Sequence, residues 1–200
     1  MLMQAPPASE LMQKIEHEAA RAGEVVQRLR NFFRGGASQL ERIGVRQLIE
    51  GALRPMREDA TRHGIILETD IADGKVELLV DRVQIETVLH SLVGNAIEAI
   101  VPTTGGERRI RVVATGAENG WVRVSVVDSG PGISPVIMDR LFEPFATTKP
   151  TGIGLGLAMS RSMVEAHGGR LAAEPGAHGG TAFLFSLPTA GLKEMINGEQ

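Results

Sequence analysis

Polar residues and glycines that could hold a nucleotide recur in the second half of the chain. In sequence order they are NAIEA (95–99), DSGPG (128–132), LFEPFATTK (141–149) and GIGLGL (152–157). A carboxylate can accept a hydrogen bond from the amino group of adenine, and glycines that open a helix leave backbone N–H groups free for phosphate oxygens. A single short glycine motif arises easily by chance, but four motifs in this order predict an ATP-binding site.

A polar stripe runs along the otherwise apolar segment 82–100. Its members are spaced by three or four residues, which places them on one side of a helix: Gln84, Thr87, Ser91, Asn95 and Glu98. The functional interpretation is that this side faces Mg²⁺ and phosphate, with Asn95 giving an oxygen ligand of the kind that Mg²⁺ prefers. For this segment alone, an ordinary solvent-facing side is an equal alternative.

Asp128 ends the strand-like run WVRVSVVD (121–128). Period-two alternation puts it on one face with Val122, Val124 and Val126. A carboxylate at the end of an apolar row is costly unless something pairs with it, and the amino group of adenine is a suitable donor. Gly130 and Gly132 would let a flat base approach the backbone. Taken alone, the same residues also fit a plain Asp-Ser-Gly-Pro turn.

Residues 133–151 hold three prolines and no clear periodicity, which predicts a mobile loop. Phe142 and Phe145 are expected to anchor this lid. Three residues at its far end can reach the phosphates: Thr147, Thr148 and Lys149. The alternative is that both phenylalanines belong to the core and that the lysine is solvated.

The composition excludes several classes of function. The net charge of −3 argues against a nucleic-acid surface or a polybasic membrane surface, and the lack of cysteine excludes thiolate metal sites and thiol catalysis. The start of the chain lacks the pattern of a signal peptide, and no apolar run approaches the ~20 residues needed to span a bilayer. We therefore expect a soluble, cytoplasmic protein.

Five segments are expected along the chain. They are a disordered start (1–8), a long helix (9–34), a linker (35–44), an ATP-binding domain (45–190) and a tail without an evident role (191–200). Apolar residues of the first helix form a heptad seam, which predicts a partner helix and allows a homodimer: Met12, Ile15, Ala19, Ala22, Val26, Leu29 and Phe33. His17 precedes Glu18 but lies off this seam, so we interpret it as a surface residue and not as a phosphoacceptor.

The order of elements predicts a two-layer α/β sandwich, with one mixed sheet and helices on one face, preceded by the long helix. Helices are expected over 45–62, 82–100 and 153–166. Strands are expected over 65–70, 76–80, 109–115, 121–128, 169–174 and 181–188. Asp81 should cap the helix 82–100, with Gln84 as the reciprocal partner in a capping box.

These motifs resemble the ATP-binding catalytic domain of sensor histidine kinases, in the superfamily shared with gyrase and the MutL repair protein. The resemblance covers about residues 9–188. NAIEA is similar to the N box of this family, DSGPG and GIGLGL to its first two glycine boxes, LFEPF to its F box and GGTAF (179–183) to its last glycine box. The lid, with a phenylalanine pair before Thr-Thr-Lys, is most similar to that of the oxygen- and nitrogen-responsive kinases.

The resemblance implies the layered, Bergerat-type ATP-binding fold and a set of roles. Asn95 would bind Mg²⁺, Asp128 and Thr181 would lie at adenine, and Asn95 and Lys149 would be catalytic. Other residues would surround the nucleotide: Gly130, Gly132, Thr147, Thr148, Gly152, Gly154, Gly156 and Leu157. The implied reaction transfers the γ-phosphoryl group of ATP to a histidine and then to the aspartate of a response regulator.

Two departures from the family pattern bear on this function. Ser91 stands where the family usually has Asn, and the acceptor motif, His-Glu followed closely by Pro, is absent. Residues 21–33 resemble the end of the second dimerisation helix, so we expect a kinase fragment that acts on the phosphoacceptor helix of the same or a partner kinase. The alternatives are a degenerate nucleotide-binding and dimerisation module that regulates another kinase, best supported by Ser91, and a serine kinase of the anti-sigma type.

Overall fold

The computed structural model describes residues 39–72, 75–147, 152–176 and 179–198, together with Met12 and Gly23. The chain divides into two compact units, residues 1–38 and 39–200. Met12 and Gly23 are helical, as the predicted helix over 9–34 requires. The rest of that helix, with its heptad seam and His17, lies outside the described residues, and so does the segment 1–8.

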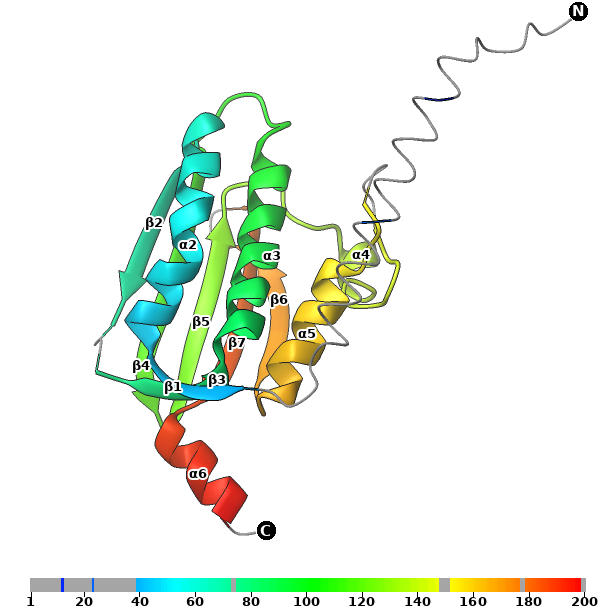
Figure 1. The fold of residues 1–200 in the computed structure, drawn as a ribbon. Coiled ribbons are helices and arrows are strands. Elements are labelled where there is room, and N and C mark those ends of the chain that lie inside the picture. The colour runs from blue at the N-terminus through cyan, green and yellow to red at the C-terminus, as the bar shows by residue number, and fades with distance from the viewer. Residues whose placement is uncertain are drawn as a thin grey trace, which may run out of the picture. The chain divides into compact units, whose positions relative to one another are not determined.

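A five-stranded mixed sheet forms one layer of the second unit, with the strand order β2-β4-β5-β7-β6. Its strands are β2 (Ile66–Ile71), β4 (Arg109–Glu118), β5 (Trp121–Asp128), β6 (Arg170–Pro175) and β7 (Thr181–Pro188). β2 runs parallel to β4, and the other neighbours are antiparallel. The helices α2 (Val45–Arg62), α3 (Arg82–Ile100) and α5 (Gly156–Ala166) cover one face of this sheet (Figure 1). The predicted α/β sandwich is confirmed.

A second, two-stranded sheet corrects two of the predictions. β1 (Leu40–Gly44) pairs antiparallel with β3 (Glu77–Asp81). Residues 40–44 are therefore a strand and not part of a linker, and β3 does not belong to the single sheet that the sequence suggested. β1 and β3 are separated in the sequence by α2 and β2, so there is no hairpin turn from which their pairing could be predicted.

Alternating strand residues build the core under the helices. The central strands turn these side chains toward the helical layer, where they are buried: Ile110, Val112, Val122, Val124, Val126, Phe183 and Phe185. From α3, Leu89 and Leu92 are fully buried against them. Burial of a side chain of this size stabilises the fold by about 1.5–3 kcal/mol. The core therefore holds α3 firmly over the centre of the sheet.

The start of α3 differs from the predicted capping box. The Asp81 side chain accepts a hydrogen bond from the backbone N–H of Gln84 at 3.2 Å, as expected. The Gln84 side chain, however, donates to the other carboxylate oxygen of Asp81 at 3.2 Å and not to the backbone. The backbone N–H of Asp81 donates instead to His167 Nε2 at 2.9 Å. His167 therefore ties the end of α5 to the start of α3.

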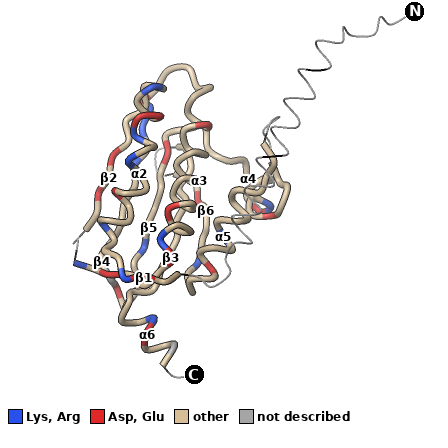
Figure 2. The backbone as a smooth tube through the Cα atoms, viewed as in Figure 1, with Lys and Arg blue, Asp and Glu red and all other residues tan. Residues whose placement is uncertain are grey.

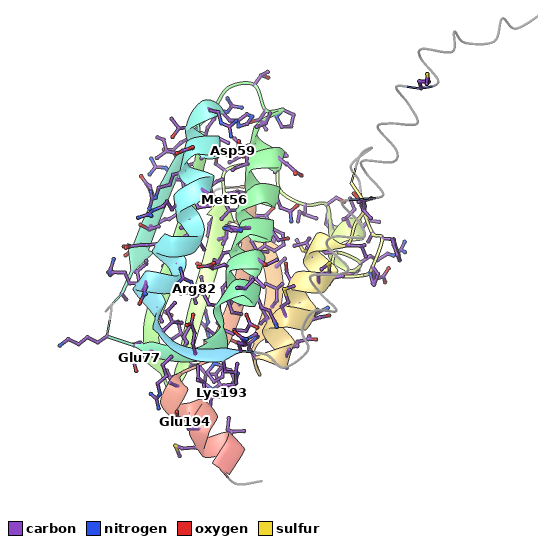
Figure 3. The ribbon with its side chains drawn as sticks, viewed as in Figure 1. Met56, Asp59, Glu77, Arg82, Lys193 and Glu194 are labelled. Atoms are coloured by element: carbon purple, nitrogen blue, oxygen red, sulfur yellow. The ribbon has the colours of Figure 1, made fainter. Side chains whose placement is uncertain are left out.

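The predicted tail is a structured element, the helix α6 (Ala190–Gly198). Leu192 packs against Gly120, where an added Cβ would lie 3.0 Å from the Leu192 side chain. Glu194 pairs with Arg42 of β1, and Lys193 Nζ donates to the backbone oxygen of His167 at 3.4 Å. Figure 3 shows Lys193 and Glu194 at the same end of the domain as Glu77 of β3. α6 thus links the small sheet to the main sheet and to α5.

The described residues lack a membrane-spanning helix and a cluster of metal-binding side chains. No helix there is long and apolar enough to cross a membrane. No three His, Cys, Asp or Glu side chains come together as a metal site would require. Acidic and basic residues are interspersed along the helices and strands of the second unit (Figure 2).

Acidification is expected to destabilise the domain through His167, which is 2% exposed. Its Nε2 accepts from the backbone N–H of Asp81, which requires the neutral ring, and its Nδ1 then donates to the backbone oxygen of Met163 at 2.7 Å. Burial lowers the pKa of His167, and the bond to Met163 only partly offsets it. A lowered folded-state pKa gives stability that is present above the unfolded value of about 6.5 and is lost as the pH falls through the folded value.

Urea unfolding at about pH 7.5 and at about pH 5 measures this effect. The free energy of unfolding should fall by at most ~1.4 kcal/mol per pH unit, the value for one proton. In the control variant His167→Gln, a neutral amide can replace both ring nitrogens, so its stability should change less over the same range. Equal pH dependence in the two proteins would contradict the role given to His167.

Candidate nucleotide-binding site

Asp128 ends β5 with its side chain on the helix-covered face of the sheet, where it is 4% exposed. Its Oδ1 accepts hydrogen bonds from the backbone N–H groups of Gly130 at 2.8 Å and Thr181 at 3.2 Å. Its Oδ2 accepts no hydrogen bond from the described residues and is not fully buried. The predicted buried carboxylate is confirmed, with one oxygen accessible to a donor on a ligand.

The buried carboxylate of Asp128 would be stabilised by a hydrogen-bond donor on a bound ligand. Burial raises the pKa of the Asp128 carboxyl above its usual range, and the two backbone donors oppose that rise. A buried charge with one bonded oxygen gains further from a donor at the other oxygen. The amino group of a flat heterocycle has the shape and the hydrogen for this position.

Glycines bring the backbone close around Asp128. A Cβ on Gly180 would lie 2.0 Å from the backbone oxygen of Asp128, and a Cβ on Gly130 would lie 2.9 Å from its Oδ1. Gly132 has a φ of +77°, and its added Cβ would lie 3.1 Å from the carbonyl oxygen of Gly180. Since side chains cannot occupy these positions, the backbone around residues 130, 132 and 180 packs closely about Asp128.

One face of α3 connects the two ends of the site. Ser91 Oγ lies 3.1 Å from the Cβ position of Gly156, at the start of α5, and Ala99 Cβ lies 3.2 Å from that of Gly130, beside Asp128. Asn95 is one turn from each and is half-buried. The structure therefore brings Ser91 and Asn95 of the predicted stripe to the site. Of the other members, Gln84 lies at the helix cap, and Thr87 and Glu98 are exposed.

The start of α5 offers backbone donors for an anion. The helix begins at Gly156 with no side-chain hydrogen bond at its N-cap, Leu155. The first N–H groups of a helix have no partner within it and stand at the positive end of its dipole. The prediction placed this start at Ile153, which is too early because Gly154 has a φ of +69°, a left-handed conformation outside the helix. The remaining predicted residues here, Gly152 and Leu157, are half-buried.

The lid is described as far as Thr147 and contains the short helix α4 (Pro135–Met138). Phe142 is half-buried, with the Arg161 guanidinium 4.5 Å from its ring centroid. Phe145, by contrast, is 70% exposed, so only Phe142 fits the predicted anchoring role. The backbone of Phe145 has a φ of +67°, and its N–H donates to the carbonyl oxygen of Gly154 at 2.9 Å. This turn leaves the Phe145 ring exposed. Thr147 is exposed, and Thr148 and Lys149 lie outside the described residues.

The sequence analysis did not identify Gly180 as a site residue, and it did not predict that Thr181 contacts Asp128 through its backbone. Thr181 is buried and reaches Asp128 through its backbone N–H, not through its hydroxyl. Gly180 has a φ of +71° and packs directly on the Asp128 backbone. The glycine pair in GGTAF was the available signal for this close approach, because such a φ is accessible mainly to glycine.

The sequence was compared with protein families and with individual relatives. Residues 80–191 match the family described as histidine kinase-, DNA gyrase B-, and HSP90-like ATPase. The sensor protein FixL of Bradyrhizobium diazoefficiens is 38% identical over 185 residues, which make up 92% of this chain and 36% of FixL. The chain thus spans little more than a third of the length of this curated relative.

Solved structures of two histidine kinases are similar in fold. The catalytic domain of ThkA has a TM-score of 0.67 and 32% identity, over 75% of this chain and 95% of that domain. ThkA in complex with the response regulator protein TrrA has a TM-score of 0.70 and 26% identity, over 94% of this chain and 53% of that one. Full-length ShkA in complex with AMPPNP has a TM-score of 0.74 and 25% identity, over 94% of this chain and 40% of that one.

Proposed function

The chain belongs to the histidine kinase-, DNA gyrase B-, and HSP90-like ATPase family, and from this premise we propose that it binds Mg-ATP as the catalytic domain of a two-component sensor kinase. In the proposed reaction, the bond between the γ-phosphorus and the β–γ bridging oxygen breaks and a P–N bond to a histidine forms. ADP leaves, and the phosphoryl group passes to an aspartate of a response regulator. The reaction takes place in the cytoplasm, where ATP is available.

The open oxygen of Asp128 is the observation that carries the proposal. It is a buried acceptor next to bare glycine backbone, which suits the amino group and flat ring of adenine. A ring with a carbonyl oxygen in place of this amino group would bring two acceptors together. The site should therefore prefer adenine to guanine nucleotides.

The phosphate end is assigned to three parts of the chain. Asn95 would give an oxygen ligand to Mg²⁺, and the start of α5 would hold phosphate oxygens through its backbone N–H groups. The lid would add three side chains: Thr147, Thr148 and Lys149. Mg²⁺, when bound, neutralises charge on the phosphates, while the chain positions the γ-phosphoryl group for in-line attack.

The acceptor histidine is expected on the dimerisation helix of the same or a partner kinase. The support for this is the kinase-like sequence of residues 21–33 and the absence of a His-Glu-Pro motif in the chain. The heptad seam of the predicted helix 9–34 would pair with that helix or with its own copy. A response regulator is the proposed next partner, by analogy with the ThkA–TrrA complex.

A transfer assay tests this function. The chain is mixed with Mg²⁺, γ-labelled ATP and a separately purified kinase dimerisation domain that carries the acceptor histidine. We expect acid-labile, base-stable label on that domain, and no label when its histidine is replaced by Gln. Acid-stable label would indicate a serine kinase instead.

Nucleotide binding without transfer to any such domain would favour the alternative, a module that holds nucleotide and pairs with another kinase. The contact of Ser91 with the start of α5 is the feature that favours it, because the family usually has the longer Asn there. Mixed dimers with an intact kinase that persist after loss of nucleotide binding would support this second function.

A further inference from the structure

The face of the main sheet that turns away from the helices carries a second candidate surface. α2, α3 and α5 lie on one face of the sheet (Figure 1), and strand alternation sends every second side chain to the other. The register places these outer residues in rows across the sheet. One row joins Thr115, Arg123, Ser186 and Arg170, and the next joins Val113, Ser125, Leu184 and Ala172.

Two arginines of this face have no acidic partner among the described residues. On β4, Arg109 pairs with Glu68 and Arg111 pairs with Asp70, so both charges are balanced within the sheet. The guanidinium groups of Arg123 and Arg170 form no ion pair or hydrogen bond with the described residues, although the backbone oxygen of Arg123 accepts from Thr115 Oγ1. The two arginines lie on β5 and β6, on either side of Ser186 of β7, so two guanidinium groups without an ion pair are separated by one strand.

A hollow and an aromatic side chain lie beside Arg123. The hollow has a volume of about 270 Å³ and is lined by Thr115, Glu118, Asn119, Trp121, Arg123 and Ser186. Trp121 is the only tryptophan of the chain and is half-buried. Toward the middle of the face, Val113 and Leu184 are also half-buried and lie on either side of Ser125. Trp and Arg are among the residue types most enriched in the hot spots of protein-binding surfaces, and half-buried apolar side chains can add area around them.

We propose that this outer face, centred on Trp121 and Arg123, is a docking surface for an acidic, partly apolar segment of another protein. The apolar side chains of that segment would cover Trp121 and Leu184. Its carboxylates would pair with Arg123 and Arg170, whose guanidinium groups form no ion pair with a described residue. Glu118 at the rim would disfavour a segment with acidic groups at that end, which fixes a direction for the bound chain.

The surface is separate from the nucleotide site. Asp128 and its glycines lie on the helix-covered face, whereas Arg123 and Arg170 lie on the opposite face of the same strands. Substitutions at the two arginines should therefore leave nucleotide binding unchanged, and failure of one proposal does not affect the other.

Binding of a short capped peptide of alternating Glu and Leu tests the proposal. The fluorescence of Trp121 and the backbone amide shifts of β4, β5 and β7 should change saturably. Affinity should fall when salt is raised from roughly 0.05 to 0.5 M, because exposed charge pairs are screened. In Arg123→Gln/Arg170→Gln it should fall roughly three- to tenfold, as expected for two exposed pairs. The matched control Arg54→Gln/Arg62→Gln removes the same charge from α2 and should bind as the wild type does.

Three results would overturn the proposal. The first is equal binding of a peptide of alternating Gln and Leu. The second is unchanged affinity in the Arg123→Gln/Arg170→Gln variant, whose fold is checked by circular dichroism and urea unfolding. The third is displacement of the peptide by inorganic phosphate at comparable concentration, which would indicate a site for small anions.

Discussion

The substitution Asp128→Asn is expected to remove most of the affinity for adenine nucleotides. In the variant, the amide oxygen can still accept the N–H groups of Gly130 and Thr181, which turns its NH₂ group to the open position. That NH₂ would then face the amino group of adenine, donor against donor. Loss of a hydrogen bond to a charged acceptor costs about 1.5–3 kcal/mol, so Kd for Mg-AMPPNP should rise roughly 10- to 150-fold in calorimetric titration.

The same substitution should not destabilise the free protein. Burial raises the pKa of the Asp128 carboxyl, so the folded chain holds the charged form at a cost that Asn removes. The free energy of urea unfolding without nucleotide should therefore be equal to that of the wild type or higher. If the variant lost stability together with affinity, the loss of binding would be a folding defect and the assignment of adenine to Asp128 would fail.

The substitution Gly180→Ala is expected to have the largest effect on stability. At its φ of +71°, any residue with a Cβ is strained by about 1–2 kcal/mol. The added Cβ would also lie 2.0 Å from the backbone oxygen of Asp128, so two strands would have to shift, at a further cost of about 1–3 kcal/mol. Urea unfolding should show a total loss of about 2–5 kcal/mol, and nucleotide affinity should fall because Asp128 moves.

Gly179→Ala is the matched control for this prediction. Gly179 has a similar φ of +86°, but nothing lies within 4 Å of its Cβ position. Only the conformational strain applies there, so the loss should be about 1–2 kcal/mol and nucleotide binding should persist. Similar losses in the two variants would show that the backbone of Asp128 can move away from position 180, and that the close packing of this loop does not shape the site.

The parts of the fold and site that were predictable from sequence are those with local signals. The bounds of α2 agree with the prediction at both ends, because a periodic apolar face ends just before Gly64. Asp128 was predictable because strict alternation along β5 placed a carboxylate on the buried face. Alternating apolar residues also predicted the strands β4, β5 and β7, and the order of helices and strands predicted the two-layer architecture.

The features that were missed depend on contacts between distant segments. β1 owes its conformation to β3, and α6 is held by Gly120, Arg42 and the end of α5. The hydrogen bond from the backbone N–H of Asp81 to His167 joins residues far apart in the chain, and the sequence around His167 does not predict it. Phe145 shows the opposite error, since a residue that looks like core by type is turned outward by its left-handed backbone.

A thermal-unfolding titration with Mg-AMPPNP tests the central claim, that the site around Asp128 binds adenine nucleotide, most directly. At 100 times its Kd, a ligand that binds only the folded state adds ~2.7 kcal/mol of stability. We predict a saturable rise of the unfolding midpoint in the wild type, a much smaller rise with the guanine analogue, and almost none in Asp128→Asn. An unchanged midpoint of the wild type up to millimolar Mg-AMPPNP, or equal rises in wild type and Asp128→Asn, would contradict it.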